Sequence, residues 1–215
     1  YISVTGVQTC ALPILLAWLG TVAALVWAAD APVANKQPVT ITAAGAAQAV
    51  PALKPLPGME DQAPALKVKS VILMKTSAGD VRIEVYTEAA PNAAKRFVEL
   101  VKSGFYNNTP VSRVVPGFVA QFGINWRKQY KSQEEKYFKD DPSRFALERG
   151  TLAFAKAGPD TNATQVFINY VENNRLAARN YNFTAFGKVV SGMEVVDKFA
   201  EVGEPGMGLD QEIGR

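Results

Sequence analysis

The sequence contains 215 residues, of which 48% are hydrophobic and 20% charged, and its formal net charge is +3. These values fit one globular domain with tails. Positively and negatively charged residues are mixed and Lys and Arg form no cluster, which argues against a nucleic-acid partner. Histidine is absent and Cys10 is the only cysteine, which excludes His-dependent nucleophiles, His general bases, His metal sites and an intrachain disulfide.

The two ends of the chain resemble sequencing adaptors. Residues Val4–Ile14 resemble the conceptual translation of a common adaptor oligonucleotide, and Ile213–Arg215 resembles the start of the adaptor on the other side. We therefore expect residues 1–14 and 213–215 to be adaptor-derived, in which case Cys10 carries no redox meaning. The alternative is a natural N-terminus of unusual composition.

The next segment resembles the apolar core of a signal peptide. Leu15–Ala29 carries no charge, and small residues that suit cleavage follow within 15–31. This pattern predicts export to the periplasm, with no stable membrane contact once the segment is cleaved. In the alternative, the segment stays attached and residues 15–29 anchor the chain in the inner membrane, because the uncharged run from Ala11 approaches the length of a membrane span.

An Ala- and Pro-rich stretch without a sustained period separates this segment from the domain. Such a composition is typical of a linker, which we place at residues 32–66. The domain is expected at residues 67–212.

Short apolar or alternating runs bounded by turn residues predict a series of strands in the domain. The charged and aromatic stretch from Asn125 to Leu147 has no clear period, and we interpret it as a surface excursion. Its carboxylates, together with Asp160, are interpreted as solvated. The expected strands are residues 71–76, 81–86, 111–115, 118–122, 151–155, 166–170 and 185–190.

Two helices complete the pattern. Pro91 can open a helix that stops near Gly104, and a second helix is expected over residues 193–202. Many strands with two helices indicate a mainly β protein, and a closed antiparallel β-barrel capped by two α-helices suits the pattern. The buried face of the first helix would contain Phe97, Val98 and Val101, and that of the second Val195, Val196 and Phe199.

Four blocks in a fixed order resemble the cyclophilins, the cyclosporin-type peptidyl-prolyl cis-trans isomerases. The blocks are GDVRIEVYTEAAPNAAKRFVELVKSGFYNNT, RVVPGFVAQFG, LAFAKAGPDTNATQVFIN and FTAFGKVVSGMEVVDKF. The string FINYVENNRL and the signal-like start are similar to the exported bacterial branch. The resemblance implies a closing strand after the last helix, but residues 203–212 have no strand pattern. We therefore expect this strand to be missing and the edge of the first strand of the domain to be unpaired.

The resemblance also implies the site residues and their roles. Arg113 would donate to the prolyl nitrogen, and Gln121 and Gln165 would hold the peptide and orient the arginine. Ala155 and Lys156 would offer a strand edge to the substrate backbone. The apolar pocket for the proline ring would be lined by Phe118, Val119, Phe167 and Leu176, with Phe183 at its rim.

Some positions depart from the family pattern. Ser112 and Phe183 stand where many members have His, Arg175 stands where an aromatic residue is common, and Lys156 replaces the common Asn. Arg175 and Phe183 alter the rim of the pocket, so we predict weak cyclosporin binding. None of these departures removes the proposed donor.

The sequence thus predicts a monomeric enzyme that needs no cofactor or metal. The resemblance implies that it would rotate X–Pro bonds in unfolded or folding polypeptides, and Arg, Gln and Phe without an acid–base residue suit a reaction that breaks no covalent bond. The alternative is a noncatalytic peptide-binding or chaperone module on the same fold. A hydrolytic enzyme is poorly supported, because the sequence has no His and no Gly-x-Ser-x-Gly string.

Overall fold

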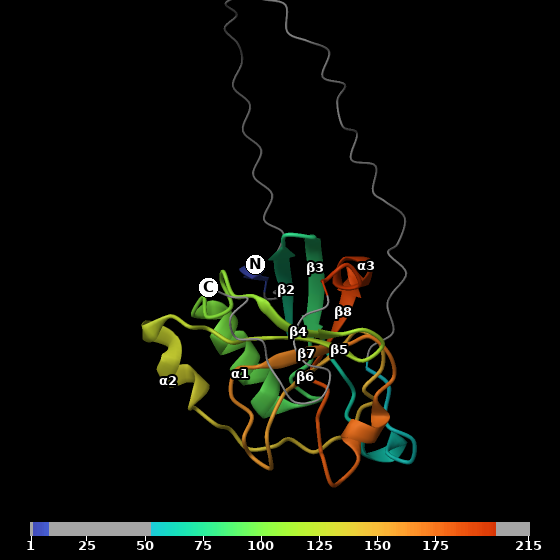
Figure 1. Ribbon diagram of the computed structural model, residues 1–215. Helices are drawn as coiled ribbons and strands as arrows, with labels where there is room; N and C mark the ends of the chain where they lie inside the picture. Colours follow the sequence, from blue (N-terminus) through green and yellow to red (C-terminus); the bar gives the residue numbers. More distant parts are fainter. Residues whose placement is uncertain (1, 9–52, 201–215) are drawn as a thin grey trace, which may run out of the picture. The chain divides into compact units, whose positions relative to one another are not determined.

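One curled antiparallel sheet forms the centre of the molecule. The structure is a computed structural model that describes residues 2–8 and 53–200. Eight strands follow one another in the order β1-β2-β3-β8-β6-β7-β5-β4, and the sheet bends so that β2 and β3 run across β5 and β7 (Figure 1). The strands are β1 (Ile2–Gln8), β2 (Ser70–Thr76), β3 (Gly79–Val85), β4 (Val111–Val115), β5 (Val119–Phe122), β6 (Thr151–Phe154), β7 (Val166–Asn169) and β8 (Gly187–Ser191).

The mainly β architecture predicted from the sequence is confirmed, and the barrel is incomplete. Each of the seven predicted strands is present, with bounds that differ by two residues at most. Strands β1 and β4 stand at opposite ends of the strand order, and no pairing joins them within the described residues. The predictions for residues 9–52 and 201–215, which include the signal-like segment and the missing closing strand, lie outside the described part of the chain.

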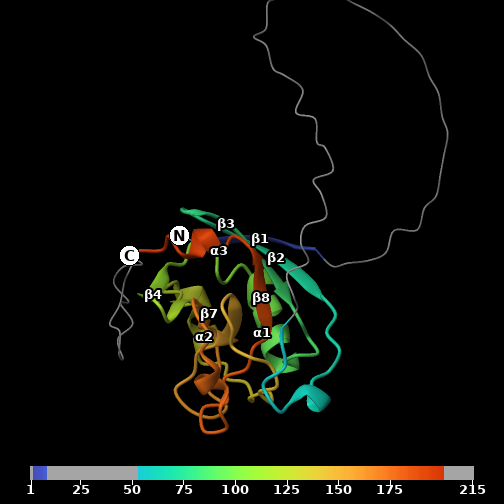
Figure 2. The same ribbon diagram turned by 90° about the vertical axis from the view of Figure 1, so that its right-hand side faces the viewer.

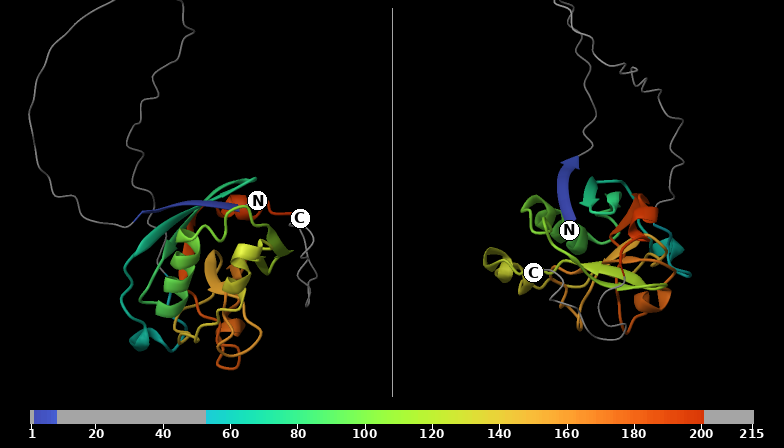
Figure 3. Two further views of the ribbon diagram at one scale, coloured as in Figure 1. Left: turned by 90° about the vertical axis from the view of Figure 1, so that its left-hand side faces the viewer. Right: turned by 45° about the horizontal axis from the view of Figure 1, so that its top comes forward.

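The predicted unpaired edge of β2 is wrong. Strand β1 lies antiparallel along this edge, with Ile2 opposite Thr76, Gln8 opposite Val71 and an irregularity in between; Figure 3 shows this strand in blue beside the sheet. Strand addition depends on main-chain hydrogen bonds, so an edge can accept an extended segment whose side chains were not selected for it.

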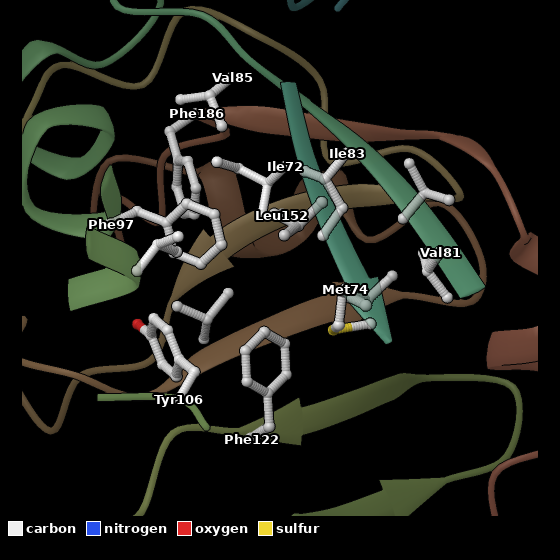
Figure 4. Packing of buried hydrophobic residues seen from close by; sticks show 14 of the residues in the cluster. Ile72, Met74, Val81, Ile83, Val85, Phe97, Tyr106, Phe122, Leu152 and Phe186 are labelled. Carbon is white, nitrogen blue, oxygen red and sulfur yellow. The ribbon is translucent and has the colours of Figure 1, made fainter. Parts of the chain in front are cut away.

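The interior of the curled sheet holds the larger of two hydrophobic clusters, which we call the barrel core. Ile72, Met74, Val81 and Ile83 contribute from β2 and β3, where buried residues alternate with less buried ones. Figure 4 shows these side chains converging with aromatic rings from other elements. The rings pack in tilted and edge-on contacts with centroid distances of 5.1–5.5 Å, which are favourable geometries for aromatic pairs. The fully buried aromatic members are Phe97, Phe105, Tyr106, Phe122 and Phe186.

The first predicted helix is present and the second is shorter than expected. In α1, Leu100 is buried and Val98 only partly buried, so the buried face is rotated from the predicted one. The second helix ends at Val196, although Val195 and Val196 are buried as predicted. Within the described residues no helix is long and apolar enough to cross a membrane. The helices are α1 (Pro91–Lys102), α2 (Lys131–Glu134) and α3 (Met193–Val196), with 3-10 turns η1 (Glu60–Gln62), η2 (Lys128–Tyr130) and η3 (Asn174–Ala177); Figure 2 gives a second view of the three helices.

The prediction of a linker through residue 66 is wrong for residues 53–66. Leu53 is 4% exposed, and Pro55 forms a β-bridge with Phe145. The main chain of this segment also pairs with residues 144–146 through Leu56 N–H to Arg144 O and Ala146 N–H to Lys54 O. A few anchored apolar side chains are enough to hold an Ala/Pro-rich segment that has no period of its own.

The stretch from Asn125 to Leu147 is also less exposed than predicted. It contains η2 and α2, and Phe145 and Leu147 are fully buried at its end. Three of its carboxylates have partners. Glu134 accepts a hydrogen bond from the N–H of Asn125, Asp140 pairs with Lys156, and the buried Asp141 accepts hydrogen bonds from the start of α1. The interpretation of these three as solvated groups is therefore wrong.

Candidate active site

The predicted site lies on the outward face of strands β4, β5, β7 and β6. Arg113 stands opposite Gln121, Gln121 opposite Phe167, and Phe167 opposite Ala153. Residues that are directly opposed in antiparallel strands project from the same face. One row across four strands thus brings together an arginine, an amide and an aromatic ring that are far apart in the sequence.

The residues that alternate with this row point the other way. Val114, Ala120, Ile168 and Leu152 are cross-strand partners of one another and belong to the barrel core. Successive residues of a strand face opposite sides of a sheet. The sheet therefore separates the barrel core from a second hydrophobic cluster on its outer face, which we call the outer cluster.

The outer cluster gathers the five apolar residues predicted for the pocket and its rim, together with Ala155 of the predicted strand edge. Val119 and Phe167 are nearly buried and form its floor, while the others are partly exposed. Phe167 and Phe183 meet edge to face, with ring centroids 5.7 Å apart and planes at 72°. The partly exposed members are Phe118, Ala155, Leu176 and Phe183. They form a partly exposed apolar surface that is floored by buried side chains.

Arg113 stands at the edge of this surface. Its guanidinium carbon lies 5.8 Å from the centroid of the Phe118 ring, which is a cation–π distance. Partial burial lowers the pKa of Arg113 by desolvation. An arginine still remains charged at any working pH and keeps its donors in a rigid fork. The site therefore contains a permanent, partly desolvated cation beside an apolar pocket.

The two predicted glutamines form a pair. Gln121 Nε2 donates to Gln165 Oε1 at 2.8 Å. Gly123 makes the approach of their two segments possible, because a Cβ there would clash with the carbonyl oxygen of Thr164. Next to Gln165 and Ala155 lies a cavity of about 180 Å³ that Glu134 and Tyr137 also line. The Gln121–Gln165 pair thus lies between the row that contains Arg113 and this cavity.

The chain is similar in sequence and in fold to known proteins. The sequence profile described as "Cyclophilin type peptidyl-prolyl cis-trans isomerase/CLD" matches residues 71–211. The chain belongs to the cyclophilin family. It is 38% identical over 148 residues to a peptidyl-prolyl cis-trans isomerase of Acinetobacter baylyi, covering 67% of this chain and 79% of that protein. It is 36% identical over 148 residues to peptidyl-prolyl cis-trans isomerase A of Dickeya dadantii, covering 66% and 77%.

A solved cyclophilin has the same fold. The crystal structure of a cyclophilin-type isomerase of Cryptosporidium parvum is similar with a TM-score of 0.53 at 26% identity, over 67% of this chain and 93% of that one. The bacterial relatives are consistent with the bacterial branch that the sequence indicates, and the profile match over residues 71–211 includes all of the predicted site residues.

In this cyclophilin the side chain of Lys156 has a role that the sequence did not indicate. Its Nζ lies 2.5 Å from Asp140 Oδ2, 3.1 Å from Asn182 O and 5.5 Å from the centroid of Phe183, and the side chain is 5% exposed. Asp140 also accepts a hydrogen bond from Asn162. The ammonium group therefore joins the end of β6 to two loops and to the pocket rim, while Ala155 still pairs with Gln165 through its N–H.

A second group that the sequence analysis missed supports the other end of the pocket. Asn173 is buried and its Nδ2 donates to Phe118 O and to Asn169 Oδ1, while Asn169 Nδ2 donates to Thr151. No sequence pattern singles out these asparagines, because their partners come from other strands and turns. The described residues contain no cluster of three His, Cys, Asp or Glu side chains that is suited to a metal ion.

Proposed function

We propose that this cyclophilin accelerates rotation about X–Pro bonds in unfolded or folding polypeptides, with Arg113 as the principal donor. The observation that carries the proposal is the placement of Arg113 in one row with Gln121 and Phe167, at the edge of the outer cluster. The likeness to a Cryptosporidium parvum cyclophilin whose crystals were studied in the presence of the dipeptide Ala-Pro supports a proline-containing ligand.

The mechanism follows from the chemistry of the amide bond. Its barrier to rotation is roughly 18–20 kcal/mol because the nitrogen lone pair is conjugated with the carbonyl group. In the twisted amide the lone pair is localised and accepts a hydrogen bond. A fixed guanidinium aimed at that nitrogen stabilises the transition state more than the planar ground state, which is the requirement for catalysis. No proton leaves and no covalent bond breaks, so the absence of His is no obstacle.

The other site residues hold the peptide. The proline ring would rest on Phe118 and Leu176 above the floor made by Val119 and Phe167. The Gln121–Gln165 pair would hold the peptide backbone, and the edge at Ala155 and Lys156 would pair with it. Such main-chain recognition tolerates many sequences around the proline. We expect the chain to act as a monomer on these substrates.

The test is NMR exchange spectroscopy on a short X–Pro peptide with the protein and its Arg113→Ala variant. Removing one preorganised donor typically lowers a rate by about 10²–10³-fold. We expect kcat/KM to fall by about this factor while circular dichroism shows an unchanged fold. Arg82→Ala, in β3 and away from the row, is the control and should keep full activity. A folded parent that binds the peptide without accelerating exchange would favour the peptide-binding or chaperone module instead.

We also propose that the chain is exported, with residues 15–31 as the cleaved signal segment and the periplasm as the destination. The uncharged run Leu15–Ala29 and the small residues after it support this proposal. Fractionation of cells expressing a C-terminally tagged chain, with N-terminal sequencing of the product, would test it. Tagged protein in the periplasmic fraction that begins after residue 28 or 31 is expected. An intact segment in the membrane fraction would instead support anchoring through residues 15–29.

A further inference from the structure

A second guanidinium stands at the mouth of the proline pocket. The Arg175 Cζ lies 5.6 Å from the centroid of the Phe118 ring, on which Arg113 also packs at 5.8 Å. Phe118 is partly exposed and Arg175 is exposed. Two cations thus share one residue of the outer cluster, and the second of them is exposed to solvent.

Arg175 is presented by an anchored turn. It lies in η3, whose preceding residue Asn173 donates through Nδ2 to Phe118 O and through its N–H to Leu147 O. Asn174 Oδ1 accepts from Leu147 N–H, and Leu176 O accepts from Phe183 N–H. These bonds tie both ends of the turn to the pocket. The backbone that carries Arg175 is therefore fixed, and only its side chain must be ordered when it binds a partner.

The two ends of the pocket differ in charge. Lys156, at the β6 end, is neutralised by Asp140 at 2.5 Å. Arg175 forms no ion pair with any carboxylate in residues 53–200. The strand register separates the two ends, because Ala155 pairs with Gln165 at the start of β7 whereas Asn173 bonds to Asn169 at its end. Within residues 53–200, Arg175 therefore places a cation without an ion-pair partner at the end of the pocket that is remote from the β6 edge.

We propose that Arg175 selects substrates that carry an Asp or Glu side chain beside the proline, on the side of the peptide that leaves over η3. The inference rests on the proposed isomerase function and names the substrate class of the same site. A carboxylate matches the planar fork of a guanidinium and can bind it in a bidentate manner. The packing of Arg175 on Phe118 places this contact next to the bond that rotates.

The test uses two series of capped five-residue peptides with Glu, Gln or Lys directly after or directly before the proline. Exchange spectroscopy gives kcat/KM for each peptide at low and at high salt. In one series we expect Glu to exceed Gln by about three-fold at low salt, with Lys the slowest, because exposed ion pairs contribute modestly. High salt should reduce the ratio toward one. Arg175→Gln should abolish the preference and Arg175→Glu should reverse it.

Arg179→Gln is the matched control, since Arg179 is an exposed arginine four positions farther along the same segment. This variant should keep the preference for Glu. Equal rates for Glu and Gln with an active enzyme, or a preference that survives in Arg175→Gln, would overturn the inference and leave the isomerase proposal intact. A folded protein that accelerates none of the peptides would overturn both.

Discussion

Neighbouring residues of the same strand serve two different regions of this cyclophilin. In β5, Ala120 and Phe122 belong to the barrel core, whereas Val119 and Gln121 belong to the site on the outer face. The barrel core consists of buried aliphatic and aromatic side chains. The outer cluster is floored by buried residues but ends in partly exposed rings and charged groups.

One sheet has both roles because its inner face packs the barrel core and its outer face carries the site residues. Because side chains alternate with a period of two, a strand that is pinned by its core-facing residues also fixes its outward residues. A slip by one residue would exchange the two sets, so packing of the barrel core enforces the alignment of Arg113, Gln121 and Phe167. Core substitutions should therefore change stability first, and site substitutions should change rate first.

The largest effect is expected for Phe122→Ala. Phe122 is 1% exposed, and its ring lies 5.5 Å from that of Tyr106 at 70°. Truncating a buried phenylalanine typically costs about 3–5 kcal/mol. Urea denaturation followed by circular dichroism should show a loss of this size in the free energy of unfolding. Phe122→Leu, which keeps most of the volume, should lose much less and remain folded enough for assay.

The adjacent residue offers the matched control. Gln121→Ala removes the hydrogen bond to Gln165 and should cost only about 1 kcal/mol of stability. Its kcat/KM should nevertheless fall more than that of Phe122→Leu measured well below the unfolding transition. If fully folded Phe122→Leu instead loses more activity than fully folded Gln121→Ala, the assignment of stability to the core face and of rate to the outer face is wrong.

Local patterns were enough to predict most of the fold. The positions of the strands and the helix from Pro91 follow from alternation, turn residues and a helix stop, which are properties of short windows of sequence. The exact face of α1 was missed because Phe97 and Val101 fit two adjacent faces, and only packing selects Leu100 over Val98. The β1–β2 pairing was missed because edge pairing depends on the main chain and leaves little trace in side-chain order.

The residues of the candidate site were predicted through the family resemblance, but the residues that hold them in position were not. Arg113, Gln121, Gln165 and the apolar residues come together as expected. The resemblance gave no partner for Lys156, and nothing near Asp140 or Asn173 in the sequence shows what they bind. Such pairs join segments that are distant along the chain, so they become visible only when the sheet and loops are assembled.

The consecutive residues Asp140 and Asp141 also serve two different regions, the site on the outer face and the barrel core. Asp140 holds Lys156 beside the site, whereas Asp141 serves the barrel core through α1. The Asp141 carboxylate accepts hydrogen bonds from the N–H groups of Asn92 and Ala93 at 3.2 and 2.9 Å. Ala90 at the N-cap of the helix provides no side-chain cap. A residue far along the chain therefore caps the helix in its place.

A smaller loss than that of Phe122→Ala is expected for Asp141→Ala. Removing a helix cap costs about 0.5–2 kcal/mol, and we expect about 2 kcal/mol because the second donor is also left without its partner. Urea denaturation at neutral pH would measure it. Asp140→Ala is the counterpart, and we expect it to change the pocket through Lys156 and to leave α1 capped. If Asp141→Ala is as stable as the parent, the capping role is wrong.

The pH dependence of stability sharpens this last comparison. Burial, with a smaller contribution from the charge of Asp140, raises the pKa of Asp141 above its ordinary value, although the two N–H groups and Arg144 act in the opposite direction. A folded-state pKa above the unfolded value means that the folded protein binds the proton more tightly. The part of the contribution of Asp141 that depends on its protonation is then fully present below the unfolded pKa of about 4 and is lost as the pH rises through the folded pKa. The hydrogen bonds that cap α1 still contribute at neutral pH. Asp141→Asn has no such titration. The unfolding free energy of the parent should therefore fall relative to that of this variant as the pH rises from about 4. A difference that shifts in favour of the parent over the same range would mean that the hydrogen bonds from α1, and not burial, dominate at this carboxylate.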